Sequence, residues 1–182
     1  MNRVPRNLGR RVEAPPRTAG SPRPMFAINE SVIAKSERWL RSPPWRGRES
    51  IVYWTGVKRD DLWLVTTVIK PRAVTSRGSF RTSADANARV VEFLFQAGLA
   101  LLGQAHTHEG DHVDHSVGDD EDAFMPKENM VSIVVPQYAR RGMRALDLCG
   151  VHRYESGRFR RLRPAEINAD VCIIPTSRNL SR

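Results

Sequence analysis

Two histidines separated by one residue, followed at fixed intervals by a serine and an aspartate, constrain this chain more than any other feature. The tract reads His106-Thr107-His108, then seven residues, Ser116, two residues and Asp119. Side chains alternate along an extended strand, so His106 and His108 turn to the same side where a strand ends. Asp119 then approaches from the following element as an oxygen ligand. The tract therefore predicts a strand end, a loop and a further element arranged around one metal position.

The residue types in this tract indicate the chemistry. Two histidines, one carboxylate and an open fourth position for water form the usual ligand set of a catalytic zinc site, whereas four protein ligands close a structural site. Hydrolysis also needs a group that takes a proton from water and gives it to the leaving amine. Glu49 stands just before an apolar stretch, 51–56, and is placed for that role. Glu30 and Glu92 are the other upstream candidates, and neither precedes a strand of this kind.

Several of these residues also have simpler readings. Ser116 and Asp119 fit a capping box of a helix that begins near Val117, and a ligand carboxylate is not free to reach back fully to the cap. His112 and His115 fall outside the motif and are expected to be exposed loop residues. Asp111, Asp114 and the cluster Asp120, Glu121 and Asp122 are expected to be solvated, the last three favourably near a helix start.

The charge of the tract contrasts with that of the whole chain. The 182 residues carry a net charge of +9, but positions 106–122 contain seven acids and no lysine or arginine. We therefore expect a negative mouth that attracts a basic substrate tail. Residues 1–24 hold six arginines against one glutamate and are expected to be a disordered arm. The remaining charge is spread too evenly along the chain to form one patch, so nucleic-acid binding is not expected as the main function.

Length and composition favour one domain with tails. We expect a basic arm over 1–24, the folded domain over 25–163, and an edge strand or tail over 164–182. No apolar run approaches the roughly 20 residues of a membrane helix, and the start lacks a secretory h-region. A cytoplasmic protein with two reduced cysteines, Cys149 in the core and Cys172, is the expectation.

The hydrophobic pattern predicts a mixed α/β or α+β sheet flanked by helices. A long helix over 84–102, ended by Gly103, should be deeply buried against the sheet, and 70–82 should be a polar connection. Other expected elements are a helix over 30–40, a hairpin of strands 50–56 and 62–69, and strands over 26–29, 130–135, 145–154, 158–162 and 171–174.

Glu49, the apolar strand after it, the long helix and the spaced histidine, serine and aspartate together resemble the JAMM signature of the JAB/MPN metalloproteases. The resemblance covers roughly residues 26–160. It implies an MPN fold of cytidine-deaminase-like architecture, with zinc held by His106, His108 and Asp119. Glu49 would correspond to the general acid/base, and Ser116 to the residue that steadies the oxyanion.

The resemblance also implies a function. Members with the full zinc set hydrolyse a peptide or isopeptide bond after the C-terminal tail of ubiquitin or a ubiquitin-like protein, by direct attack of zinc-activated water. The stand-alone size resembles the prokaryotic branch, which works beside activating and conjugating enzymes in ubiquitination-like or antiphage systems, or processes a precursor. The tail would run along 70–82, 123–129 and the strand that follows.

Two alternatives stay open. RadC-like proteins have nearly the same spacing, but their histidines are followed by Pro-Ser-Gly, where this chain has Glu109-Gly110-Asp111. A non-catalytic MPN scaffold that only binds a protein partner would typically have lost ligands, and this chain keeps all three.

Overall fold

A computed structural model of the chain describes residues 25–41 and 47–176. The arm expected over 1–24 lies outside the described residues. Within the described part, no helix is long and apolar enough to cross a membrane.

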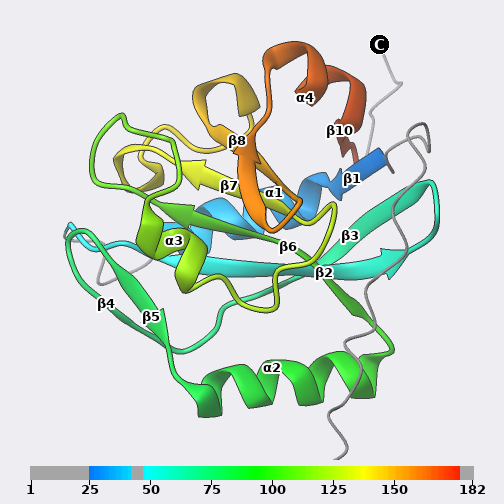
Figure 1. The fold of residues 1–182 in the computed structure, drawn as a ribbon, viewed down its shortest axis with the longest axis horizontal. Helices are drawn as coiled ribbons and strands as arrows, with labels where there is room; N and C mark the ends of the chain where they lie inside the picture. Colours follow the sequence, from blue (N-terminus) through cyan, green and yellow to red (C-terminus); the bar gives the residue numbers. More distant parts are fainter. Residues whose placement is uncertain (1–24, 42–46, 177–182) are drawn as a thin grey trace, which may run out of the picture.

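An eight-stranded mixed sheet forms the centre of the molecule (Figure 1). The predicted mixture is confirmed, since the pairs β1–β10, β1–β3 and β6–β7 are parallel and the remaining pairs are antiparallel. The strand order across the sheet is β10 (Val171–Ile174), β1 (Met25–Asn29), β3 (Leu62–Ile69), β2 (Ile51–Lys58), β6 (Ala100–Thr107), β7 (Val131–Val135), β8 (Gly150–Glu155) and β9 (Arg158–Arg161).

The core lies along the middle strands. Every residue of β7 is buried, and so are residues 51–56 of β2 and 101–107 of β6, because helices and loops cover both faces there. Helix α1 (Glu30–Leu40) packs across the sheet and is fixed by a buried hydrogen bond of 2.9 Å from Trp54 Nε1 to Ser36 Oγ. Asn29 caps α1 by accepting from Ser31 N. Along the chain, helix α4 (Pro164–Asp170) connects β9 to β10, the strands at the two ends of the sheet.

The helix expected over 84–102 is shorter than predicted. Helix α2 (Ala84–Ala97) ends at Gly98, which has a left-handed φ of 62° that suits glycine, and β6 begins two residues later. Gly103 lies inside β6, where a Cβ would stand 2.6 Å from the carbonyl oxygen of Val131. The expected stop was wrong because an apolar strand follows the helix after only two residues, and its residues continue the helix's hydrophobic pattern.

The expected deep burial of α2 is also wrong. Only Ala86, Val90 and Leu94 are buried, whereas Phe95 is 88% exposed. Figure 1 shows α2 lying along one side of the molecule, so one stripe of the helix faces the core.

Two further predictions need correction. The polar connection over 70–82 contains a small hairpin of β4 (Ala73–Thr75) and β5 (Phe80–Thr82), strands too short to leave an alternating pattern. The strand expected over 145–154 begins only at Gly150, because a short 3-10 turn (Leu146–Leu148) precedes it.

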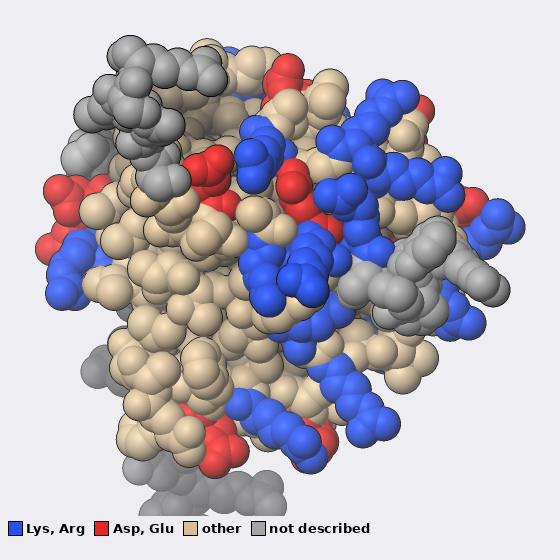
Figure 2. All heavy atoms as spheres, turned by 180° about the vertical axis from the view of Figure 1, so that it is seen from behind, with Lys and Arg blue, Asp and Glu red and all other residues tan. Residues whose placement is uncertain are grey.

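Figure 2 shows lysine and arginine side chains gathered in a band on the face opposite to the view of Figure 1. The expectation that the basic charge forms no patch is therefore wrong for this face. Folding places side chains from distant positions of the chain side by side, which a count along the sequence does not detect.

Candidate metal and catalytic site

Three side chains meet at the end of β6, near the centre of the sheet. The nitrogen and oxygen atoms of His106, His108 and Asp119 that could bind one ion all lie within 4.8 Å of one another. His106 is fully buried on β6, His108 follows the strand, and Asp119 projects from helix α3 (Val117–Glu121). The two-residue spacing of the histidines brings their rings to the same side, as the sequence predicted.

The distances between these atoms fit a bound cation. His106 Nε2 lies 3.3 Å from His108 Nε2 and 3.4 Å from Asp119 Oδ1, and His108 Nε2 lies 3.2 Å from Asp119 Oδ2. A tetrahedral ion with bonds of about 2.0–2.1 Å holds its ligand atoms roughly 3.3–3.4 Å apart. The two imidazole nitrogens stand at about this separation, and each lies at a similar distance from one of the two Asp119 oxygens, His106 facing Oδ1 and His108 facing Oδ2.

Asp119 serves as both a helix cap and a candidate ligand. Its Oδ2 accepts hydrogen bonds from Ser116 N at 2.7 Å and Ser116 Oγ at 2.8 Å, while Asp119 N donates to Ser116 Oγ at 3.2 Å. The capping box expected for Ser116 and Asp119 is therefore present. Oδ2 closes this box and also lies 3.2 Å from His108 Nε2, whereas Oδ1 faces His106.

The pKa shifts of His106 and Asp119 suit metal binding, whereas that of His108 means that a proton competes with the metal. Burial lowers the pKa of His106, so its imidazole is neutral, the form that ligates metals. For Asp119, burial acts to raise the pKa, but hydrogen bonds from His106 and His108 outweigh it and hold the pKa well below its usual range. Burial likewise acts to lower the pKa of His108, and the hydrogen bond and charge of Asp119 outweigh it, so the pKa of His108 is raised.

Glu49 lies directly across from His108. Ile51 of β2 pairs with His106 in an antiparallel register, and Thr107 N donates to Ser50 O at 3.0 Å, so the next step of the register sets Glu49 opposite His108. Glu49 is 6% exposed, and its backbone N–H donates to Ser76 O at 2.8 Å.

Burial is the main cause that raises the pKa of Glu49 to about 7, with His108 acting against it and the Asp119 carboxylate adding to it. A carboxyl group with this pKa can both accept and release a proton near neutral pH. The alternatives fit less well, since Glu30 pairs with Arg144 at 3.4 Å and Glu92 is exposed on α2.

His115 was placed wrongly by the sequence analysis. Its side chain is only 4% exposed, and its ring packs between His106 at 5.3 Å and Phe159 at 4.7 Å. Nδ1 lies 2.8 Å from Asp120 Oδ1, and Nε2 lies 2.9 Å from Ser132 Oγ on β7. His115 therefore ties the helix that carries Asp119 to the sheet behind it. The local sequence held no sign of this, because the residues that cover His115 come from β7, β8 and β9.

His112 is exposed, as expected. Its backbone oxygen lies 3.0 Å from His108 Nδ1, and its ring stacks on the ring of His108 with centroids 6.1 Å apart. The loop thus orients His108 through its second nitrogen. His106 Nδ1, in contrast, is buried and has no hydrogen-bond partner among the described residues.

The acidic stretch is less negative in the fold than in the sequence. Three of its carboxylates pair with arginines from other segments: Glu109 with Arg77 at 3.2 Å, Asp114 with Arg161 at 2.8 Å, and Asp122 with Arg81 at 3.7 Å. Asp111 accepts a hydrogen bond from the Gln137 side chain. Arginines supplied by the fold therefore offset part of the charge counted along the tract.

The chain is similar to known proteins in sequence and in fold. No protein-family model matches the chain. A protein of Sinorhizobium fredii (strain NBRC 101917 / NGR234) named "Probable metalloprotease y4jG" is 30% identical over 118 residues, which cover 63% of this chain and 72% of that protein. The solution structure of protein DSY2949 from Desulfitobacterium hafniense matches with a TM-score of 0.60 and 15% identity, over 85% of this chain and 94% of that one.

The crystal structure of AF2198, a JAB1/MPN domain protein from Archaeoglobus fulgidus, matches with a TM-score of 0.47 and 11% identity, over 82% of this chain and 98% of that one. The likeness to DSY2949 concerns the fold alone.

Proposed function

This chain belongs to the JAB/MPN (JAMM) family of metalloproteases, and from that premise we propose that it is a zinc-dependent peptidase or isopeptidase that cleaves after the C-terminal tail of a ubiquitin-like protein. At the family level it is a metal-dependent peptidase. The observation that carries the proposal is the triangle of His106, His108 and Asp119 atoms with a buried carboxyl group, Glu49, opposite one corner.

Zinc is the proposed ion because two imidazoles and one carboxylate gathered within 4.8 Å of one another match the ligand set of catalytic zinc sites. Zinc bound there would supply Lewis-acid activation of water and of the scissile carbonyl group.

Glu49 is proposed as the proton carrier. Its raised pKa lets it take a proton from the attacking water as a carboxylate and then donate that proton to the leaving amine. Ser116 is proposed to donate a hydrogen bond to the oxyanion. Its hydroxyl donates to Asp119 Oδ2 in this structure, so it must rotate away from the capping box to act.

The β4–β5 hairpin is the proposed binding edge for the substrate tail. An extended peptide can add to an exposed strand edge, and Val74 on β4 is 82% exposed. The hairpin turn is tied to the catalytic residue by the bond from Glu49 N to Ser76 O. The segment 123–129 contacts the sheet at β2, where the Phe124 ring stacks on the Tyr53 ring with centroids 5.2 Å apart.

The proposed partners follow from this chemistry. A small ubiquitin-like protein, free as a precursor or joined to a target, supplies the tail. Activating and conjugating enzymes for the same modifier are the proposed functional neighbours.

A cleavage assay tests the function. A fluorogenic peptide that carries the tail of a ubiquitin-like protein before the fluorophore amine is incubated with the zinc-loaded protein. We expect release of the fluorophore that stops with a chelator, returns with added Zn²⁺, and is absent in Glu49→Gln. The matched control Glu92→Gln, on the exposed side of α2, should cleave like the natural chain. Cleavage that survives both chelation and Glu49→Gln would refute the proposal.

A further inference from the structure

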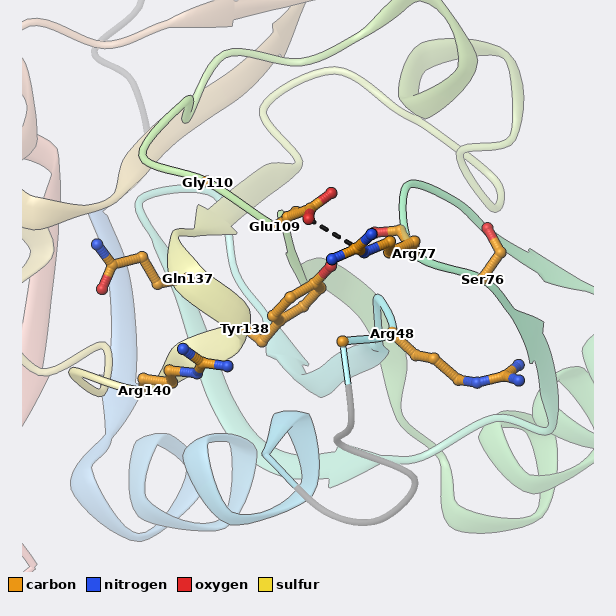
Figure 3. A pocket seen from close by; sticks show the side chains of 9 residues that line it. Arg48, Ser76, Arg77, Glu109, Gly110, Gln137, Tyr138 and Arg140 are labelled. Atoms are coloured by element: carbon orange, nitrogen blue, oxygen red, sulfur yellow. Dashed lines mark hydrogen bonds and ion pairs between the residues drawn. The ribbon is translucent and has the colours of Figure 1, made fainter.

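A recess lined by arginines lies at the ends of three neighbouring strands, β2, β6 and β7, beside the candidate site. Figure 3 shows the side chains that line it. Its volume is about 930 Å³, within the range of about 300–1,000 Å³ typical of small-ligand pockets. We call it the arginine pocket. Its walls come from residues 47–48 before β2, 76–77 at the β4–β5 turn, 109–110 after β6, and three residues between 137 and 140 after β7.

The arginine pocket shares its wall with the candidate site. Arg48 immediately precedes Glu49, and Glu109 immediately follows His108. The Cα atoms of these two lining residues are therefore only about 3.8 Å from those of Glu49 and His108. Tyr138 N donates to the carbonyl oxygen of His108 at 2.9 Å. A substrate held at the candidate site therefore has its adjoining residues within reach of the pocket.

The charge of the pocket favours an anion. Arg48, Arg77 and Arg140 line it against one carboxylate, that of Glu109. Arg77 and Glu109 form an exposed pair at 3.2 Å, and pairs of this kind contribute little stability, so an incoming anion can replace Glu109 at small cost. Arg48 donates one N–H to Thr75 O, and its other guanidinium donors have no partner within the described part of the chain.

Arg140 is the strongest candidate to bind the anion. Its side chain lies beside Tyr138 in Figure 3. Among residues 25–41 and 47–176, it has no hydrogen-bond or ion-pair partner for its guanidinium. A planar guanidinium binds a carboxylate through two parallel hydrogen bonds, which gives both affinity and orientation.

The backbone beneath the pocket is strained. Gln137, Tyr138 and Ala139 all have positive φ values, of 52°, 53° and 58°, and none is a glycine. Residues other than glycine rarely adopt this conformation, and strain of this kind gathers at ligand sites. Hydrogen bonds to the histidine loop hold the turn, from Gln137 N to Gly110 O and from Tyr138 N to His108 O. This turn places Arg140 and the Tyr138 ring in the wall of the pocket.

We propose that the arginine pocket binds a carboxylate of the substrate on the leaving-group side of the scissile bond, with Arg140 as its main contact. The inference rests on the proposed function for the identity of the substrate as a peptide. The carboxylate has two possible sources, the free C-terminus of a short extension and an acidic side chain just after the scissile bond. A free C-terminus would make the protein a trimming peptidase, because a modifier joined to a lysine side chain within a target presents no carboxylate there.

The first test measures binding without cleavage. The full-length, isotope-labelled protein is kept free of metal by a chelator, so that a carboxylate cannot bind to an ion, and is titrated by NMR with N-acetylglycine or N-acetylglycinamide. We expect saturable shifts of pocket residues with the acid and none with the amide.

Arg140→Gln should weaken binding of the acid about tenfold or more. Arg141→Gln, a neighbouring exposed arginine outside the pocket, should leave binding unchanged. Equal responses to acid and amide, or an unchanged Arg140→Gln, would overturn the inference.

The second test uses four internally quenched peptides with one tail and two residues after the scissile bond. One ends in a free acid and one in an amide, and a further amide pair carries glutamate or glutamine at the last position. We expect one carboxylate-bearing peptide to be cleaved about 10–100 times more efficiently than its neutral match, and Arg140→Gln to bring the ratio towards one.

The preferred pair identifies the source of the carboxylate. Metal-dependent cleavage at equal rates for all four peptides would overturn the pocket inference and keep the proposed function. Acid-selective binding with no cleavage of any peptide would keep the pocket and overturn the function.

Discussion

Replacement of Glu49 by glutamine should stabilise the metal-free protein while removing its proposed activity. The side chain is 6% exposed, and burial first of all raises its pKa from 4.5 to about 7. Between these two values the unfolded chain has lost the proton that the folded chain still holds. Stability therefore falls as the pH rises from about 4.5 to about 7, and the full cost remains at higher pH.

The size of the effect follows from that difference in pKa. At about 1.4 kcal/mol for each tenfold difference in proton affinity, the ionised carboxylate costs roughly 3 kcal/mol at pH 8. Relaxation of nearby water and polar groups reduces this, so we expect Glu49→Gln to raise the free energy of unfolding by about 1–2 kcal/mol at pH 8. Near pH 5 the two proteins should differ little, because the carboxyl group is then protonated in the fold.

Urea unfolding followed by tryptophan fluorescence, in the presence of a chelator, measures this difference at both pH values. Glu92→Gln is the control, since it makes the same change on the exposed side of α2. If Glu49→Gln is no more stable than the natural chain at pH 8, or gains the same stability at pH 5, then burial of this carboxylate is not costly and the argument for its raised pKa fails.

Three other changes test the site and the sheet. His115→Ala removes the link from the helix of Asp119 to Ser132 and should weaken metal affinity about 10–100-fold, measured with a competing chelator; unchanged affinity would argue against the link. Because the pKa of His108 is raised above its usual 6.5, its proton must leave before a metal binds, so metal affinity should begin to fall at a pH above 6.5 on acidification and should depend less on pH in His108→Ala. Gly103→Ala places a Cβ 2.6 Å from the carbonyl oxygen of Val131 and should cost about 1–3 kcal/mol in urea unfolding; a smaller loss would mean that β6 and β7 separate easily.

The sequence predicted well those features that depend on residues close together in the chain. The spacing of His106 and His108 brought both rings to one side, and the apolar stretch after Glu49 formed the strand beside them. Alternation and helix caps are local properties, so one sequence is enough to recognise them.

Features built from distant segments could not be predicted in this way. His115 is buried by Phe159 and His152, and the arginine pocket is assembled from four separate segments. The end of α2 was misplaced for a local reason, since the pattern of an amphipathic helix passes without a break into that of a buried strand. Gly98, not Gly103, ends the helix. The residues after Gly98 continue the apolar pattern of the helix, and only their pairing with β2 shows that they belong to the sheet.

The capping box of Ser116 and Asp119 separates folding of the ligand site from metal loading. Two hydrogen bonds of the box, from Ser116 N and from Ser116 Oγ, hold the Asp119 carboxylate, so the start of helix α3 orients this candidate ligand. We therefore expect a competing chelator to remove the metal, and added metal to restore it, without unfolding of the chain.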